Sequence, residues 1–267
     1  MPTFNGRGFK IHYVEEGKGP AVVFAHGFCM DHTMYAAQFE ELPETYRCIA
    51  WDMRGHGRSE CPPGPWTIQD TVVDLVAFIE DVNAAPCHLV GMSWGGFIAV
   101  RMAMQREDLV RSLVLIDTSA DAEPSENVEA YGGFMEAIRA NDGIPDEIAT
   151  GTLPIFYGER FMNEHPEVME IHVDREKKMA TTALVEGISA IITRDSVMDR
   201  LGEIRVPTLV IHGEADQAIP IAGAEKLAEG IPGAELVRVP EAGHTAPLET
   251  PDIVNEALAG FFARVKR

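Results

Sequence analysis

The sequence predicts an α/β protein built on a mostly parallel β-sheet that is flanked by helices. Short, almost continuously apolar runs such as Ala21–Ala25 alternate with stretches of helical periodicity such as Thr67–Asn83. Nearly continuous apolar runs are typical of parallel strands covered on both faces, and strands alternating with helices imply right-handed crossovers. A third observation is one long interval, Thr118–Val206, that contains no convincing strand.

The strands can be placed in order along the chain. Lys10–Glu15 alternates in polarity, and Asn5-Gly6 before it is a hairpin-turn signal, so the chain is expected to open with antiparallel strands. The apolar runs that follow predict the parallel strands, at Ala21–Ala25, Arg47–Trp51, His88–Gly91, Ser112–Asp117, Thr208–His212 and Glu235–Val239.

Three helices are predicted between and after these strands. Thr67–Asn83 places a row of aliphatic residues on one face, and Thr67 is a suitable N-cap. Gly95–Arg106 has a similar pattern. Pro251–Arg264 follows Thr250, a combination typical of a helix start.

The interval Thr118–Val206 is 89 residues long and breaks this alternation. Since a structureless loop of that length is improbable in a compact domain, it is expected to be helical. Helix-like stretches occur at Val128–Ala140, Met179–Ile192 and Ser196–Leu201. We interpret residues 120–200 as a helical lid, or cap, inserted into a core made of residues 1–119 and 201–267.

Composition excludes several classes of partner. The 42 acidic and 22 basic residues give a net charge of −20, which repels phosphate backbones and anionic lipid surfaces. No apolar run approaches the ~20 residues that cross a bilayer, and the first residues lack the pattern of a signal peptide. We therefore expect a cytoplasmic protein that acts on a small molecule. The oligomeric state cannot be predicted.

Metal and cofactor chemistry are not indicated. The four cysteines are scattered without CxxC spacing, and Cys48 and Cys87 fall in strand-like runs where buried thiols are expected. The sequence has no HExxH, no GxxxxGK[ST] phosphate loop and no GxGxxG. No metal and no cofactor are implied.

The strongest chemical signal is Gly-x-Ser-x-Gly at residues 91–95, which makes Ser93 the candidate nucleophile. The motif follows the apolar run CHLVG and opens the helix-like run GGFIAVRMAM. This is the strand–turn–helix setting of a nucleophile elbow. The alternative, a glycine-rich turn without chemistry, is disfavoured by that setting.

A serine hydroxyl needs a base and an orienting acid, because it is a poor nucleophile at neutral pH. His244 is the candidate base, since it lies in a polar loop between the last strand and the last helix. Asp216 follows the strand Thr208–His212 in a short polar loop and is the favoured acid. Asp117, at the end of another strand, is the competing candidate. The order Ser…Asp…His fits either.

Two backbone amides are candidates for an oxyanion hole. The amide of Trp94 follows the nucleophile directly, and the amide of Phe28 lies in His26-Gly27-Phe28-Cys29, after the strand Ala21–Ala25. Fixed amides of this kind act most strongly on the charge that develops in a tetrahedral transition state. The imidazole of His26 itself is not expected to transfer protons in the reaction.

An ordered set of motifs resembles the α/β-hydrolase superfamily over nearly the whole chain, most weakly in the lid. The motifs are HGF at 26–28, DMRGHGRS at 52–59, GMSWGG at 91–96, HGEADQAIP at 212–220 and GH at 243–244. The resemblance implies an eight-stranded sheet, a Ser93–His244–Asp216 triad and an oxyanion hole from Phe28 and Trp94. It also implies that Asp52, Arg54 and His56 hold a structural loop. Ser93 argues against the branches that use Asp as nucleophile.

The sequence is similar to lactonase, esterase and meta-cleavage C–C hydrolase branches of that superfamily. We expect a serine hydrolase that cleaves a carboxylic ester or lactone through an acyl-enzyme, with Met30, Met135 and Met162 lining the substrate pocket. One alternative is a C–C bond hydrolase, which would call for polar groups in the lid to grip a carboxylate, and Arg139, Arg160, Arg175 and Arg194 are present there. Another is a small-molecule receptor built on a hydrolase scaffold.

Overall fold

One twisted sheet of eight strands organises the fold in the computed structural model, which describes residues 3–265. The strand order across the sheet is β1-β2-β4-β3-β5-β6-β7-β8. The strands are β1 (Thr3–Gly6), β2 (Phe9–Glu16), β3 (Ala21–Ala25), β4 (Arg47–Trp51), β5 (Cys87–Met92), β6 (Val110–Ile116), β7 (Thr208–Gly213) and β8 (Glu235–Val239). The predicted sheet class and the predicted strands are confirmed.

The sheet is antiparallel only at its start. β2 pairs antiparallel with β1 and β4, and all later pairs are parallel. The predicted position of the first turn is wrong by one dipeptide. Asn5 and Gly6 pair with Lys10 and Phe9 inside the hairpin, and the turn falls on Arg7-Gly8, where both residues have positive φ.

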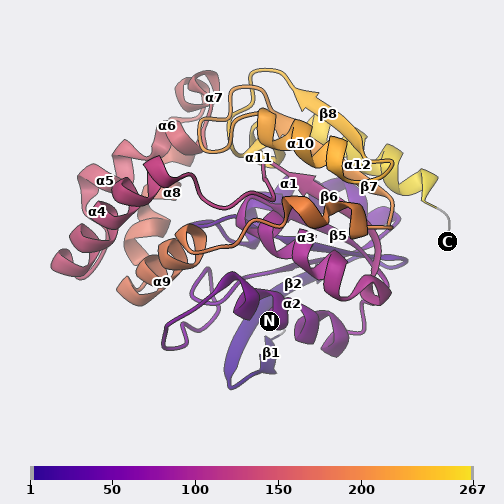
Figure 1. The fold of residues 1–267 in the computed structure, drawn as a ribbon, viewed down its shortest axis with the longest axis horizontal. Coiled ribbons are helices and arrows are strands. Elements are labelled where there is room, and N and C mark those ends of the chain that lie inside the picture. The colour runs from indigo at the N-terminus through magenta and orange to yellow at the C-terminus, as the bar shows by residue number, and fades with distance from the viewer. Residues whose placement is uncertain (1–2, 266–267) are drawn as a thin grey trace.

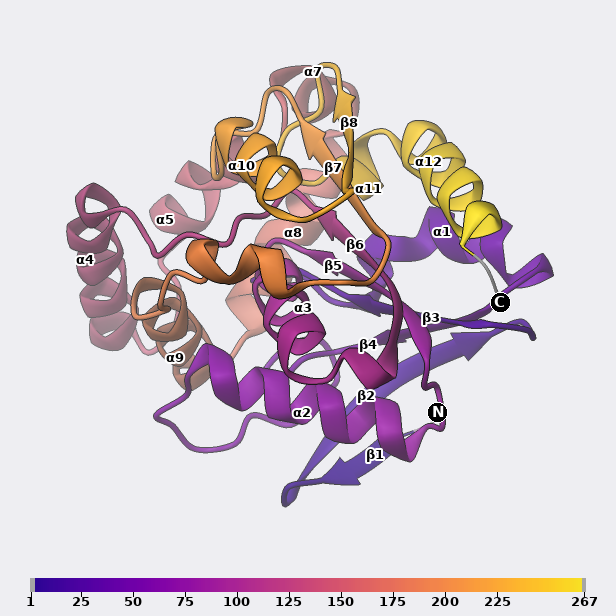
Figure 2. The same cartoon turned by 45° about the vertical axis from the view of Figure 1, so that its right-hand side comes forward.

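Helices cover both faces of the sheet (Figure 2). The helices α2 (Ile68–Asp81), α3 (Trp94–Gln105) and α10 (Ala222–Gly230) bury apolar residues against one face. The helices α1 (Ala36–Glu41), α11 (Ala246–Glu249) and α12 (Pro251–Arg264) lie over the other. Short 3₁₀ turns occur at η1 (His32–Tyr35), η2 (Leu42–Glu44), η3 (Glu107–Leu109) and η4 (Met198–Glu203).

Local capping explains where α2 begins. The Thr67 hydroxyl accepts from the Asp70 amide and the Asp70 carboxylate accepts from the Thr67 amide, which is a complete capping box. The helix predicted after Thr250 also forms, although the Thr250 hydroxyl donates to the Ala246 carbonyl and does not cap it.

Six helices fill most of the long interval between β6 and β7, and no strand occurs in it within residues 3–265. They are α4 (Ser125–Asn141), α5 (Asp146–Gly151), α6 (Leu153–Phe156), α7 (Glu159–Glu164), α8 (Pro166–Lys178) and α9 (Thr181–Ile192). Figure 1 shows them gathered on one side of the sheet. The third helix-like stretch, Ser196–Leu201, lies mostly in the 3₁₀ turn η4. We keep the name lid for residues 120–200.

Among the described residues, no helix combines the length and the apolar character needed to span a membrane.

Candidate active site

Ser93 lies at a strained turn between β5 and α3. Its backbone has φ 50° and ψ −115°, a conformation that non-glycine residues rarely adopt. The neighbouring glycines make this turn possible. A Cβ on Gly91 would come within 2.3 Å of the Gly95 carbonyl oxygen, and a Cβ on Gly95 within 2.0 Å of the Ala25 carbonyl oxygen. The turn therefore has the form of a nucleophile elbow.

Ser93, His244 and Asp216 form a hydrogen-bonded chain. Oγ of Ser93 lies 2.8 Å from Nε2 of His244, and Nδ1 of His244 lies 2.8 Å from Oδ2 of Asp216. Because a carboxylate can only accept, Nδ1 carries the imidazole proton and Nε2 accepts from the Ser93 hydroxyl. These three side chains come from loops after β5, β7 and β8, which end at the same edge of the sheet.

The loop after β7 fixes the carboxylate of Asp216. Its Oδ1 accepts from the amides of Ala218 and Ile219 at 2.8 and 2.9 Å, which leaves Oδ2 for His244. Burial alone lowers the pKa of His244, but the charge of Asp216 and its hydrogen bond outweigh burial. The pKa of His244 is therefore raised above 6.5.

Asp117, the competing acid, is fully buried but forms no hydrogen bond with His244. Its oxygens accept from the amides of Gly213 and Ala246 at 2.8 and 2.9 Å. Burial, followed by repulsion from Asp216, raises the pKa of Asp117 to about 8. This carboxyl joins the loops that carry Asp216 and His244.

The amides of Phe28 and Trp94, predicted to form an oxyanion hole, belong to two neighbouring segments. Within residues 3–265, neither amide has a hydrogen-bond acceptor. The two segments lie together, because the Gly95 amide donates to the His26 carbonyl at 3.1 Å and a Cβ on Gly27 would lie 3.3 Å from Cβ of Ser93. Both N–H groups are thus unengaged, one in the residue after Gly27 and one in the residue after Ser93.

His26 holds the backbone of this loop in place. Its Nδ1 donates to the Gly27 carbonyl at 2.7 Å, and its Nε2 accepts from the Met53 amide at 2.9 Å. Burial lowers the pKa of His26, which keeps the ring neutral in that arrangement.

The segment 52–59 is held by polar contacts of its own. Asp52 accepts from His12, His32 and the Arg58 amide, and Arg54 pairs with Asp74 at 2.6 Å. Nδ1 of His56 donates to the Arg54 carbonyl at 2.9 Å. None of these contacts involves Ser93.

Two groups of side chains place three potential metal-ligand atoms within 4.8 Å of one another: His12, His32 and Asp52, and Asp117, His212 and Asp216. In both groups the carboxylates already accept hydrogen bonds from histidines or backbone amides. The carboxylates of both groups are therefore engaged within the protein.

An apolar pocket opens beside Phe28, between the core and the lid. Its cavity volume is about 70 Å³, and its walls include Phe28, Phe134, Ile138, Phe156 and Leu184. The Phe156 carbonyl accepts from the His244 amide at 3.1 Å, so the pocket wall continues into the loop that carries His244.

The three methionines predicted to bind substrate do not line this pocket. Met30 is buried in the core below the lid, and its sulfur accepts from Arg175 at 3.4 Å. Met135 packs against the cluster that contains Ile138 and Leu184, and Met162 packs against the cluster that contains Tyr157 and Met169. Their role in binding substrate stays a prediction.

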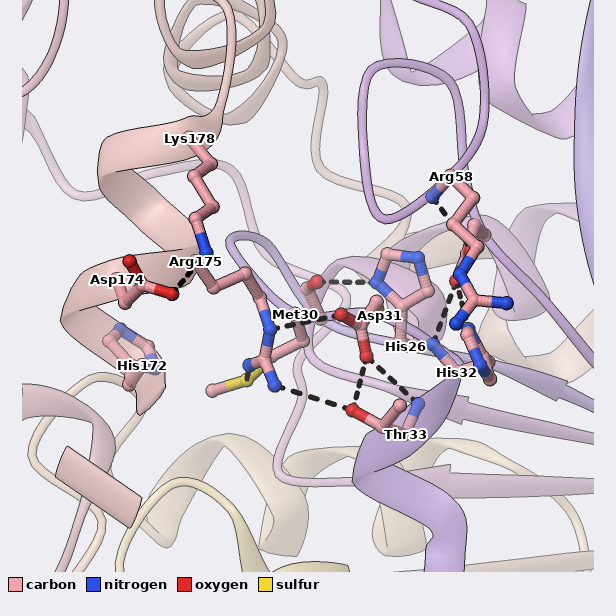
Figure 3. A network of polar contacts seen from close by, with 12 residues as sticks. His26, Met30, Asp31, His32, Thr33, Arg58, His172, Asp174, Arg175 and Lys178 are labelled. Atoms are coloured by element: carbon pink, nitrogen blue, oxygen red, sulfur yellow. Dashed lines mark hydrogen bonds and ion pairs between the residues drawn. The ribbon is translucent and has the colours of Figure 1, made fainter. Parts of the chain in front are cut away.

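A polar network fastens the lid to the loop after β3. Nε of Arg175, on α8, donates to Asp31 at 3.0 Å, and the guanidinium also contacts Thr33 at 3.3 Å. Figure 3 shows this side chain extending from α8 to Asp31 and Thr33. The loop so fastened includes Phe28 and Cys29.

None of the four arginines named for the C–C hydrolase alternative lines the apolar pocket. Arg160 pairs with Glu164 and Glu241, and Arg194 pairs with Glu123. Arg139 is exposed near the end of α4. Together with the engagement of Arg175, this leaves the pocket without an arginine that could grip a carboxylate.

A buried acid on the lid was missed in the sequence. Glu176 lines the apolar pocket and is only 2% exposed. The signal was present, because Met169, His172 and Glu176 have the three- and four-residue spacing of one buried helix face. A glutamate on such a face requires an explanation.

Comparison with known proteins agrees with this geometry. Residues 20–251 match the family described as the alpha/beta hydrolase fold. The chain belongs to the α/β-hydrolase fold family. Within this family it is similar to RutD of Azorhizobium caulinodans, provisionally named a carbamate hydrolase, with 27% identity over 99% of both chains.

Two solved structures are also similar. A thermophilic esterase from Thermogutta terrifontis has a TM-score of 0.91 and 30% identity, over 99% of this chain and 97% of that one. The enol-lactonase from Burkholderia xenovorans has a TM-score of 0.90 and 26% identity, over 98% of this chain and 100% of that one. These relatives support a hydrolase activity for this member of the family.

Proposed function

We propose that this chain is a serine hydrolase that cleaves a carboxylic ester or lactone through an acyl-enzyme. The observation that carries the proposal is the chain of hydrogen bonds from Ser93 through His244 to Asp216, with 2.8 Å at each link. The free amides of Phe28 and Trp94 and the apolar pocket beside them support it. The esterase and enol-lactonase among the similar structures agree with this substrate class.

The geometry suggests the order of proton transfers. Nε2 of His244 takes the hydroxyl proton as Oγ of Ser93 attacks the carbonyl carbon, and Asp216 stabilises the resulting imidazolium. The amides of Phe28 and Trp94 hold the oxyanion. His244 then gives its proton to the leaving alcohol, and the acyl-enzyme forms. A water molecule, deprotonated by His244, then attacks the acyl carbon. As the bond from the acyl carbon to Oγ breaks, His244 returns the proton to Oγ of Ser93 and the acid is released.

The C–C hydrolase alternative gains no support from the pocket, because that reaction calls for a grip on a substrate carboxylate.

A cytoplasmic location is proposed on a separate ground. All four cysteines are free thiols, and three of them are buried. Proteins of reducing compartments commonly keep their thiols in this form.

Labelling with a fluorophosphonate tests the proposed nucleophile directly. We expect one label per chain on the wild type, located on Ser93 by peptide mass spectrometry, and none on Ser93→Ala. A panel of p-nitrophenyl acetate, p-nitrophenyl butyrate and γ- and δ-lactones then tests the reaction. Equal rates for the wild type and Ser93→Ala across the panel contradict a serine hydrolase, and ligand-induced thermal stabilisation without turnover indicates the receptor alternative.

A further inference from the structure

Glu176 is a buried acid in the wall of an otherwise largely apolar pocket. The residue is 2% exposed, and Phe28, Phe134, Ile138 and Leu184 line the same space. Buried carboxyl groups are costly unless their oxygens are paired. The partners of Glu176 therefore indicate whether its role is structural.

One carboxyl oxygen of Glu176 has no hydrogen-bond partner among residues 3–265. Oε2 of Glu176 makes no hydrogen bond. The other oxygen, Oε1, lies 3.3 Å from Nε2 of His172, and that nitrogen makes no hydrogen bond. Nδ1 of His172 is already engaged by the Tyr157 hydroxyl at 2.9 Å. The protein thus leaves an acceptor unsatisfied at the pocket wall.

Neither the Cys29 thiol nor the Arg175 guanidinium gives Oε2 a hydrogen bond. Burial, followed by the charge of Glu176 and a hydrogen bond to it, raises the pKa of the Cys29 thiol well above its usual range. The thiol therefore keeps its proton, but an S–H group is a weak donor. Arg175 precedes Glu176 in the chain, but Figure 3 shows its guanidinium directed to Asp31 and Thr33.

Two residues of the pocket wall connect it to the loops of the proposed active site. Phe28 contributes its ring to the pocket wall and its amide to the oxyanion site. The ring of Phe156 stands between two histidines, with centroid distances of 4.7 Å to His172 and 6.3 Å to His244. The Phe156 carbonyl also accepts from the His244 amide at 3.1 Å, so Phe28 and Phe156 join the wall that holds Glu176 to the loops of the oxyanion site and of His244.

We propose that Glu176 is a specificity-determining residue. In this role it accepts a hydrogen bond from a neutral donor, a hydroxyl or an amide N–H, carried by the acyl chain of the ester or lactone substrate. This inference rests on the proposed function. A neutral donor is favoured over an ammonium group, because moving a cation into a narrow, mostly apolar pocket has a much larger desolvation cost. The aromatic and aliphatic walls hold the rest of the acyl chain.

Matched ligand pairs test the proposal by binding alone. The pairs are ethyl 6-hydroxyhexanoate with ethyl heptanoate, and ethyl 3-hydroxybutanoate with ethyl 3-methylbutanoate, in which a hydroxyl replaces a methyl group. Dissociation constants are measured by calorimetry on Ser93→Ala, which binds the esters without turning them over. The same measurements are made after adding Glu176→Met, Glu176→Leu or, as a control, Glu170→Met on the exposed face of α8.

In a purely apolar pocket, the ester whose acyl chain carries the methyl group binds more tightly than the one with the hydroxyl, since burial of a methyl group is favourable. With Glu176 present, we expect the hydroxyl ester of at least one pair to bind at least as tightly as its methyl partner. Removing the carboxylate should change the ratio of the two Kd values of that pair about tenfold or more in favour of the methyl-bearing partner, because the hydroxyl then loses its acceptor. The Glu170 control should leave the ratio unchanged.

If Ser93→Ala with Glu176 intact binds the methyl-bearing partner more tightly in both pairs, the inference is overturned, even if the Glu176 variants do not fold. An unchanged ratio in a folded Glu176 variant does the same. Ser93-dependent hydrolysis of ethyl heptanoate is scored separately. Its absence counts against the proposed reaction, whereas its presence with an unchanged ratio counts against Glu176 alone.

Discussion

Asp216 and His244 are joined by a 2.8 Å hydrogen bond, and the remaining oxygen of Asp216 is held by two backbone amides. The carboxylate is therefore fixed on both sides, and the imidazole tautomer is fixed with it. Asp117 stands at the end of the adjacent strand and is bound by amides alone. The two carboxyl groups therefore differ in their contacts, since only Asp216 bonds the imidazole.

Replacing Asp216 with Asn should lower kcat for p-nitrophenyl butyrate by about 10³- to 10⁴-fold. An amide can donate to Nδ1, which favours the tautomer with the proton on Nε2, where it cannot accept from Ser93. Initial rates measured at substrate saturation check this. Circular dichroism should show an unchanged fold.

Asp117→Asn is the matched variant, and we expect it to lower kcat by less than about tenfold, because its oxygens contact backbone amides and not His244. A loss at Asp117 that equals or exceeds the loss at Asp216 would make Asp117 the orienting acid.

Activity should depend on the protonation of His244. Only the neutral ring can accept the Ser93 proton, and the pKa of His244 is raised above 6.5 by Asp216 despite burial. We therefore expect kcat/KM to fall as pH decreases through a value above 6.5. A profile from pH 5 to 9 with an ester whose leaving group does not titrate checks this. An acid limb below pH 6 would contradict the raised pKa.

The strands and the elbow could be predicted because their signals are local. Ala21–Ala25 is apolar at every position and is buried at every position. At Asn5-Gly6 the same reasoning failed, because the competing dipeptide Arg7-Gly8 supplies the positive φ angles of the turn. Choice between neighbouring turn signals depends on strand register, which the sequence does not display.

In the lid, local sequence signals do not predict the short helices or the residues that line the pocket. Short helices such as α6 and α7 have little periodicity of their own, and their position depends on contacts with the core. For the same reason residue type alone suggests Met30, Met135 and Met162 as pocket residues, whereas the walls of the apolar pocket beside Phe28 include residues such as Ile138 and Glu176 that the packing of the lid brings together.

The elbow should be intolerant of any side chain at Gly95. A Cβ there would lie 2.0 Å from the Ala25 carbonyl oxygen, which belongs to the central sheet and cannot move away cheaply. We expect Gly95→Ala to destabilise the fold by ~3 kcal/mol or to prevent folding. Urea unfolding followed by tryptophan fluorescence measures the change.

Gly132→Ala provides the control, since nothing lies within 4 Å of the added Cβ and the residue is inside helix α4. That variant should gain about 0.5–1 kcal/mol, because glycine is unfavourable within a helix. Equal destabilisation by both variants would mean that the close approach at Gly95 is not what constrains the elbow.

Arg175 should be the contact that keeps α8 against the loop after β3, which includes Phe28 and Cys29. Its side chain is 18% exposed and bonds Asp31, which is 15% exposed, so water screens the pair weakly. Arg175→Met should cost about 1–3 kcal/mol and should speed amide hydrogen exchange at Phe28 and Cys29, because the loop loses its tie to the lid. Lys178→Met removes an exposed pair with Asp174 within the same helix and should change neither quantity measurably. Equal exchange rates at Phe28 in Arg175→Met and the wild type would show that packing alone holds the loop.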